Sequence, residues 1–208
     1  MRALSGSLTP VLVALAVVAL GACSSSRMVQ VPPRMDLRGM GPIGMVTFSS
    51  NEGDEIAVQA TREFLSALQS AQPGVPVLEI PAPAGGALDP AAVRALGKEH
   101  GVSALIVGVL EAKPVKPKVS VGGGLESLNA KAEIEAQLNA KLYEAGSGAT
   151  MWSSLAHARE TVASVSVTGG GLAGIGANSR DDANGRLVRE LVAQATEDFR
   201  PGWVRQRN

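Results

Sequence analysis

The spacing of apolar residues changes several times along the chain, and each change predicts a new element. A short apolar run at 43–48 fits a buried strand. From about 51 to 72 the apolar residues recur at helical spacing, and Ser49 with Glu52 offers a capping box in front of them. The sequence therefore predicts a strand followed directly by an amphipathic helix.

Two further strands are predicted downstream. Residues 75–80 alternate toward a strand, but Pro76 lacks an amide donor, which favours an edge position. Residues 104–110 form the most continuous apolar run after the N-terminal segment. Such a run is typical of a central strand that is covered on both faces.

Caps and prolines predict two more helices. Asp89 followed by a proline predicts the start of a helix over 90–100, and Gly101 predicts its end. Ser179 with Asp182 forms a second capping pair, which opens a last helix that a later proline closes.

A long hairpin lies between these helices. Residues 130–143 alternate between apolar and polar side chains through seven repeats, which predicts a strand with one solvated face. A glycine-rich turn at 145–148 reverses the chain, and residues 150–163 return as the partner strand. Right-handed crossovers would make the first three strands parallel. We therefore predict an α/β (mixed α+β) fold with a single mixed sheet of about five strands packed by three helices, in the order β-α-β-α-β-β-β-α.

The N-terminus has the pattern of a targeting segment. Arg2 precedes an uncharged apolar run at 11–20, which is too short to span a bilayer but suits a signal-peptide core. The run ends in LGAC, whose Cys23 is the only cysteine of the chain. LGAC resembles the lipobox of bacterial lipoproteins, which implies cleavage between Ala22 and Cys23 and a thioether-linked diacylglycerol on Cys23. The alternative is a short N-terminal helix with a buried cysteine.

The segment after Cys23 is predicted to be a tether. It has several serines and prolines and no period of either kind. The alternative is that Val29 and Val31 form an extra edge strand. The predicted parts are a signal peptide over 1–22, a tether over 23–41 with acylated Cys23, a periplasmic α/β domain over 42–203 and a tail over 204–208.

The lipobox resemblance also implies a location. Lipoproteins with Asp after the cysteine are retained in the inner membrane, whereas this chain has Ser24. Diacyl anchors hold a protein at a membrane almost permanently. We therefore expect an outer-membrane lipoprotein whose domain faces the periplasm.

The composition excludes several classes of binding partner and reactive group. Nineteen Lys and Arg balance nineteen Asp and Glu, so the chain has no electrostatic footprint for nucleic acid. With its one cysteine acylated, the mature chain can form no internal disulfide and has no thiol nucleophile. Hydrophobic residues make up 45%, but only three Phe, two Trp and one Tyr are present, so we expect a core of Ala, Val, Leu and Ile.

Two segments carry a second resemblance. GVSALIVGVLEA at 101–112 and LYEAGSGATMWSS at 142–154 resemble segments of periplasmic lipoproteins that share this order of elements. That group includes curli-secretion (CsgG-type) lipoproteins, lipoprotein activators of penicillin-binding proteins and the N-terminal domain of the TolB protein. The resemblance covers roughly 42–203 and implies a fold and a compartment. It implies no catalytic residue.

Two glycine-rich stretches echo one another, VSVGGGL at 119–125 and VSVTGGGL at 165–172. We interpret them as hairpin tips or loops at the same end of the domain, and they are either mobile loops or a partner-binding or ring-forming surface. Entry into a membrane is disfavoured, because the first hairpin contains Lys116, Pro117 and Lys118 in one arm and Glu126 and Lys131 in its return, and apolar residues stop after Val167 in the second. The candidate partner-binding glycines are Gly122, Gly123, Gly124, Gly169, Gly170 and Gly171.

No residue set predicts catalysis, a metal site or a cofactor site. His100 ends a helix and His157 lies in a strand, without the spacing of metal ligands. The glycines Gly169, Gly171 and Gly174 fit G-x-G-x-x-G. They follow the fifth predicted strand, however, whereas a dinucleotide site has this motif after the first strand.

Trp203, near the C-terminus, is a candidate anchor for a partner. The alternative is that it caps the core at the end of the last helix. We expect a non-enzymatic assembly, scaffold or regulatory component of an envelope complex, held at the membrane by its lipid and possessing no cofactor. The alternative function is a CsgG-type secretion ring subunit, a homo-oligomer with the glycine-rich hairpins at its channel.

Overall fold

The structure is a computed structural model that describes residues 26–83, 88–121, 127–168, 171–177 and 180–207. The chain divides into two units. One contains the residues before Pro33 and after Arg200, and the other is the α/β domain, Pro33–Arg200. The predicted signal peptide and Cys23 lie outside the described residues.

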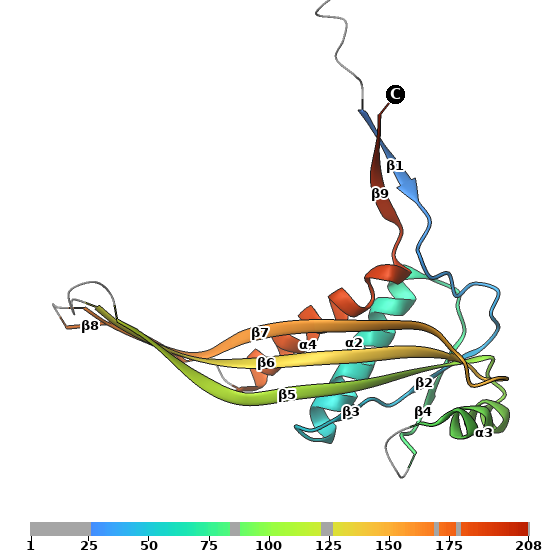
Figure 1. Ribbon diagram of the computed structural model, residues 1–208, viewed down its shortest axis with the longest axis horizontal. Coiled ribbons are helices and arrows are strands. Elements are labelled where there is room, and N and C mark those ends of the chain that lie inside the picture. The colour runs from blue at the N-terminus through green and yellow to red at the C-terminus, as the bar shows by residue number, and fades with distance from the viewer. Residues whose placement is uncertain (1–25, 84–87, 122–126, 169–170, 178–179, 208) are drawn as a thin grey trace, which may run out of the picture. The chain divides into compact units, whose positions relative to one another are not determined.

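The domain is built on one mixed sheet, with strand order β4-β2-β5-β6-β7-β8 and β3 beside β5 (Figure 1). β2 pairs in parallel with β4 and β5, and the remaining neighbours along β5 to β8 are antiparallel. The predicted mixed α+β fold is therefore confirmed. The strands are β2 (Ile43–Val46), β3 (Ser49–Ser50), β4 (Val77–Ile80), β5 (Ala104–Val121), β6 (Ser127–Glu144), β7 (Thr150–Thr168) and β8 (Gly171–Ala177).

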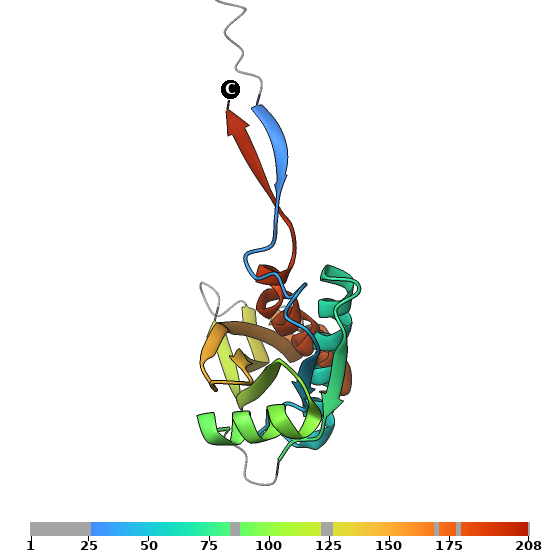
Figure 2. The same cartoon turned by 90° about the vertical axis from the view of Figure 1, so that its right-hand side faces the viewer.

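Within the described residues, the domain also contains three α-helices and one short 3-10 helix. They are α2 (Asp54–Ala71), α3 (Pro90–His100), α4 (Arg180–Ala195) and η2 (Glu197–Phe199). α2 and α4 contact each other and supply side chains to the main core on one face of the sheet, and α3 supplies a smaller cluster with β2, β4 and β5 (Figure 2). No helix within the described ranges is long and apolar enough to cross a membrane.

Three buried aromatic rings connect the helices to the sheet. Phe64 on α2 packs edge-on against Phe48 at 5.3 Å between ring centroids and against Phe199 at 6.3 Å. Trp152 on β7 lies against Phe199 at 4.6 Å and donates from Nε1 to the Asp198 carboxylate at 3.1 Å. The aromatic contacts thus join α2 and η2 to β7, although aromatic residues are few.

The caps of α3 agree with the sequence prediction. The Asp89 carboxylate accepts from the Ala92 backbone N–H at 2.7 Å, and Pro90 is the first helical residue. Gly101 ends the helix at φ 64°, a left-handed conformation that favours glycine. Two local signals with a clear physical cause therefore place both ends of this helix.

The predicted capping box of α2 is wrong. Ser49 and Ser50 pair with β5 as β3, so the helix begins at Asp54. Asn51 continues along that strand, because its side chain exchanges two hydrogen bonds of 2.8 Å with the Ala112 backbone. The segment before the helix is thus drawn into the sheet.

The predicted tether is also largely ordered. Ser26–Val31 forms β1, which pairs antiparallel with β9 (Gly202–Arg207), as in the alternative that placed a strand at Val29 and Val31. Leu37 is buried in the main core, and its N–H donates to the Gln72 side chain at 2.7 Å. Long-range pairing therefore orders a segment that has no period of its own.

Two of the predicted strands extend well beyond their predicted ends. β5 continues beyond residue 110 to Val121 through a lysine- and proline-rich segment, and a register shift between Lys113 and Lys116 accommodates Pro114. β7 continues to Thr168, and β8 was not predicted. The predicted edge position of the 75–80 strand is confirmed, since among the described strands β4 pairs only with β2.

Candidate functional site

The long strands divide into two parts at the point where α4 begins. β8 pairs with β7 and ends at Ala177, opposite Ala163, and α4 starts at Arg180. α4 then runs back along β7, where Arg186 contacts Glu160 and Gln194 contacts the backbone of His157. The helices therefore overlie only the part of the sheet nearest β2, as Figure 1 shows.

These two parts are named here by their residues. The helix-covered sheet comprises 104–112 of β5, 134–144 of β6 and 150–162 of β7. The distal sheet comprises 117–121 of β5, 127–132 of β6, 163–168 of β7 and all of β8. Register shifts at Lys113/Lys116 and at Ala132/Glu133 lie together at the boundary between them. Bulges increase the local twist, so the boundary is a natural place for the sheet to turn away from the helices.

The register of the distal sheet arranges its residues in alternating rows across four strands. Every second row consists of apolar residues, and the rows between them consist of Ser, Asn, Lys and Gly. Because alternate residues of a strand belong to opposite faces, one face is assigned the apolar rows. These rows are Pro117, Ala132, Ala163 and Ala177; Val119, Ala130, Val165 and Ile175; and Val121, Leu128, Val167 and Leu172.

This register corrects the reason given for disfavouring a continuous apolar face. Lys118 and Lys131 are direct partners, so they occupy one polar row and do not interrupt the apolar rows. The apolar residues also continue past Val167, because β8 adds Leu172 and Ile175 to the same rows. Each bulge adds one residue to a strand. The extra residue changes which of the following side chains belong to the apolar face, so the sequence alone does not show that the apolar rows continue.

The two glycine stretches are reached by the same end of the sheet, as predicted. Val121 pairs with Leu128, and Leu128 pairs with Val167, so the strands leading into both stretches end side by side. Gly171 begins β8 opposite Thr168. Gly122, Gly123, Gly124, Gly169 and Gly170 lie outside the described residues, so their partner-binding role stays a prediction.

The helix-covered sheet has an open edge along β7. β8 pairs with β7 only from Ala163 onward, so residues 150–162 form an edge strand within the described chain. Gln194 on α4 accepts from the His157 N–H at 3.2 Å and thereby replaces one ladder bond. Met151 and Leu155 on this strand are 43% and 56% exposed. An edge strand with exposed apolar side chains is a template for pairing with another chain.

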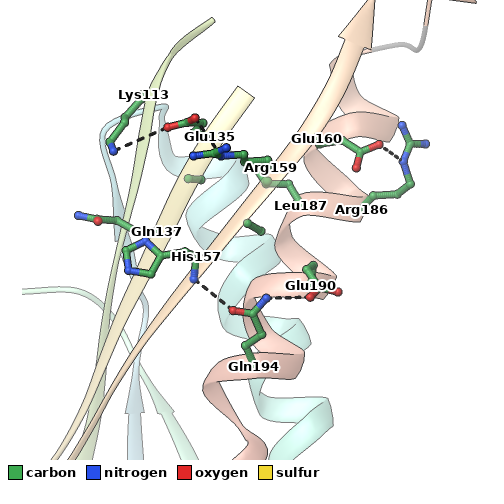
Figure 3. Close-up of a pocket in the computed structure, with 12 residues that line it drawn as sticks. Lys113, Glu135, Gln137, His157, Arg159, Glu160, Arg186, Leu187, Glu190 and Gln194 are labelled. Atoms are coloured by element: carbon green, nitrogen blue, oxygen red, sulfur yellow. Dashed lines mark hydrogen bonds and ion pairs between the residues drawn. The ribbon is translucent and has the colours of Figure 1, made fainter. Parts of the chain in front are cut away.

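A hollow of about 830 Å³ follows this edge (Figure 3). Its charges compensate one another: Glu135 contacts Arg159 at 2.9 Å and Lys113 at 3.8 Å. Glu190 accepts from the Gln194 side chain at 2.7 Å. A wall of mutually paired charges gives little selectivity for an ion, so the hollow matters mainly as space beside the edge. It is lined by Lys113, Glu135, Ala136, Gln137, His157, Ala158, Arg159, Glu160, Arg186, Leu187, Glu190 and Gln194.

The two histidines, the residues best suited to metal binding or acid-base chemistry, lie on different elements. His100 is the last residue of α3, and His157 is on β7. Among the residues that the structure describes, no group of three His, Cys, Asp or Glu side chains could hold a metal ion.

Trp203 does not cap the core, so that alternative is wrong. It lies on β9 opposite Gln30 and is 64% exposed. The position against the last helix is taken by Trp152, through Phe199 and Asp198. Sequence spacing could not choose between the two tryptophans, because the choice depends on pairing of β9 with β1.

No protein-family model matches the chain, and no curated protein matches its sequence. Solved structures share its general arrangement. A PelC dodecamer from Paraburkholderia phytofirmans is 13% identical with a TM-score of 0.44 and covers 85% of this chain and 98% of that chain. Lipoprotein GNA1162 from Neisseria meningitidis is 18% identical with a TM-score of 0.35, covering 58% and 81%. The LpoB C-terminal domain from Salmonella enterica is 11% identical with a TM-score of 0.33, covering 57% and 82%.

Bacterial lipoproteins thus occur among the structures with some likeness to this chain. All three TM-scores are below 0.5. Likeness at this level identifies no partner, activity or assembly state, and it does not favour the curli-type ring. Function has to be argued from the residues of this chain.

Proposed function

We propose that this chain is an outer-membrane lipoprotein, anchored by acyl chains on Cys23, whose domain works in the periplasm by protein contact. The sequence LGAC followed by Ser24 is the observation that carries the anchor and its location. The domain acts as an assembly, scaffold or regulatory component of an envelope complex and catalyses no reaction.

The contact surface is the apolar face of the distal sheet. Its rows contain four Val and Leu residues nearest the glycine stretches and a Val, Ala, Val, Ile row behind them. No described helix overlies these rows, in contrast to the equivalent positions of β6 beneath α2 and α4. Contiguous apolar rows beyond the helices are what a binding site for another chain would use.

The open edge of β7 is a second observation that supports the contact function. Its exposed Met151 and Leu155 stand on a strand whose outer backbone groups face solvent or the Gln194 side chain. Addition of a strand from a partner would satisfy these groups and cover both side chains. The two surfaces together describe a domain that is completed by a neighbour.

Replacement of Cys23 by Ala tests the anchor. Without the thiol no acyl chain can be attached, so the protein should leave the outer-membrane fraction. Membrane fractionation of the full-length chain measures this. Unchanged retention in the outer membrane would contradict the lipid anchor.

Paired substitutions on the distal sheet test the contact function. Val165→Asp places a charge in an apolar row, whereas Ser164→Asp, the control, places it in the neighbouring polar row. We expect Val165→Asp to abolish crosslinks between the lipoprotein and other envelope proteins and Ser164→Asp to preserve them, with both variants folded by circular dichroism. Equal crosslinking in the two variants would reject the apolar rows as the contact surface. Mass measurement in detergent would then tell a second copy of the chain from a different partner.

A further inference from the structure

The β1–β9 ribbon combines exposed apolar side chains with unbalanced positive charge. Met28, Trp203 and Val204 are 52%, 64% and 51% exposed. Ser26–Val31 and Gly202–Arg207 contain three arginines, Arg27, Arg205 and Arg207, and no acidic residue. Without these three arginines, the rest of the chain has sixteen Lys and Arg against nineteen Asp and Glu.

The pairing register places the tryptophan and an arginine in neighbouring positions on one face. Trp203 pairs with Gln30 and Arg205 pairs with Met28, and paired residues of antiparallel strands share a face. The opposite face has Val29 beside Val204. One face therefore presents an aromatic ring, a flexible thioether and a guanidinium together.

A ribbon of two strands is unstable in water without a surface to rest on. Isolated two-stranded pairs are at best marginally stable, because neither face is buried. Met28 and Trp203 are exposed, so the pairing of β1 with β9 does not itself bury them. A surface beyond these two strands is needed to cover this face of the ribbon.

The sequence indicates which surface lies nearest. Cys23 precedes Ser26 by three residues, so an extended chain between them spans at most about 11 Å. If Cys23 carries the proposed lipid, the ribbon begins within about 11 Å of the membrane. Tryptophan is favoured at the boundary between lipid headgroups and acyl chains, and arginine near an anionic surface gains about 1 kcal/mol.

We infer that the β1–β9 ribbon is a membrane-binding element that lies on phospholipid headgroups, with Trp203 at the interface and Arg205, on the same face, against anionic phosphates. This inference rests on the proposed anchor at Cys23, which brings the ribbon to the bilayer. The acyl chains hold the protein at the membrane, and contact with the headgroups fixes the orientation of the ribbon on the membrane surface. A protein partner for Trp203 is the competing occupant.

Fluorescence of Trp203 tests the lipid contact directly. The mature chain from residue 23 carries Cys23→Ser, so that no acyl chain contributes, and Trp152→Phe, so that Trp203 is the remaining tryptophan. Vesicles of phosphatidylethanolamine and phosphatidylglycerol should shift its emission to the blue, and brominated acyl chains should quench it. Vesicles of phosphatidylcholine alone should have a much smaller effect. Emission that stays unchanged with the anionic vesicles would overturn the inference.

Charge-matched variants separate the ribbon from general attraction. Arg205→Gln removes one exposed charge from the Trp203 face of the ribbon, and Arg189→Gln removes one exposed charge from α4. At about fivefold for an arginine against an anionic surface, vesicle affinity should fall about fivefold in the ribbon variant at low salt and less than about twofold in the control. Equal losses in the two variants would also overturn the inference.

These results are distinct from those that test the anchor. Vesicle binding is measured without acyl chains, whereas membrane fractionation of Cys23→Ala reports on the acyl chains alone. A wild-type protein that stays in the outer membrane while its unacylated form ignores anionic vesicles would reject the ribbon and leave the anchor standing.

Discussion

The helix-covered sheet and the distal sheet are two lengths of the same strands, but the helices of the domain overlie only the first. On β6 the alternation of apolar and polar residues runs unbroken from Leu128 to Leu142. Leu138 and Leu142 are fully buried, whereas Ala130 and Ala132 are only half buried. An alternating pattern thus assigns residues to faces, but the helices decide which part of a face becomes core.

The difference also separates stability from binding. The helix-covered sheet packs beneath the helices and supplies Leu110, Leu138 and Leu142 to the main core. The distal sheet carries the apolar rows of the proposed contact surface. Substitutions should therefore unfold the protein in the first part and disturb association in the second.

The largest contrast is expected from two leucines of β6. Leu138→Ala removes a fully buried side chain from the main core and should lower the free energy of unfolding by about 2–5 kcal/mol. Leu128→Ala, at a distal position of the same strand, should cost less than about 1 kcal/mol. Urea unfolding of the two variants measures both. Equal losses would mean that the distal sheet is packed as firmly as the helix-covered sheet.

The next largest effect is expected at Gln72, which ties the chain around Leu37 to the core. Its Oε1 accepts from the Leu37 N–H at 2.7 Å, and its Nε2 donates to the carbonyls of Met35 and Phe199 at 2.6 and 3.1 Å. Gln72→Leu leaves these buried groups without partners and should cost about 1–3 kcal/mol. Gln69→Leu, on the exposed face of α2, is the control. If Gln72→Leu lowers the free energy of unfolding no more than Gln69→Leu does, the hydrogen bonds of Gln72 do not stabilise the domain.

Glycines in the two parts of the sheet should tolerate alanine differently. A Cβ at Gly108 would meet the Phe48 ring at 2.6 Å, so Gly108→Ala should destabilise the domain by about 1–3 kcal/mol. Gly176→Ala falls in a polar row of the distal sheet and should be close to neutral. Thermal unfolding of both variants tests this. A greater loss at Gly176 would reverse the comparison.

The smallest effect is expected at Asp36, in the loop before β2. The Arg38 guanidinium donates two hydrogen bonds to its carboxylate and, with its backbone N–H, holds the pKa of Asp36 below its usual 3.8. A lowered pKa means that the contribution to stability is present above pH 3.8 and fades as the pH falls through the folded-state pKa. Asp36→Asn should lower the melting temperature slightly at neutral pH and less in acid. A difference that grows in acid would contradict this sign.

Much of the fold could be predicted, because local signals decide it. The caps at Asp89 and Gly101 place α3, and the alternation over 130–143 gives β6 its buried and solvated faces. The candidate site was predictable only in outline. The glycine stretches were placed at one end of the domain, but β8 was missed because residues 171–177 are mostly glycine and alanine and have a weak strand signal.

The sequence by itself determined the targeting pattern at Cys23, the order of the main elements and the period of each strand, because these follow from neighbouring residues. Only the tertiary structure decided that Ser49 and Ser50 join β5, that β1 pairs with β9, and that Lys118 and Lys131 share a polar row. Each of these is a pairing between residues far apart in the chain. Hydrogen bonds across strands, and the bulges that shift their phase, set such pairings, and no local period records them.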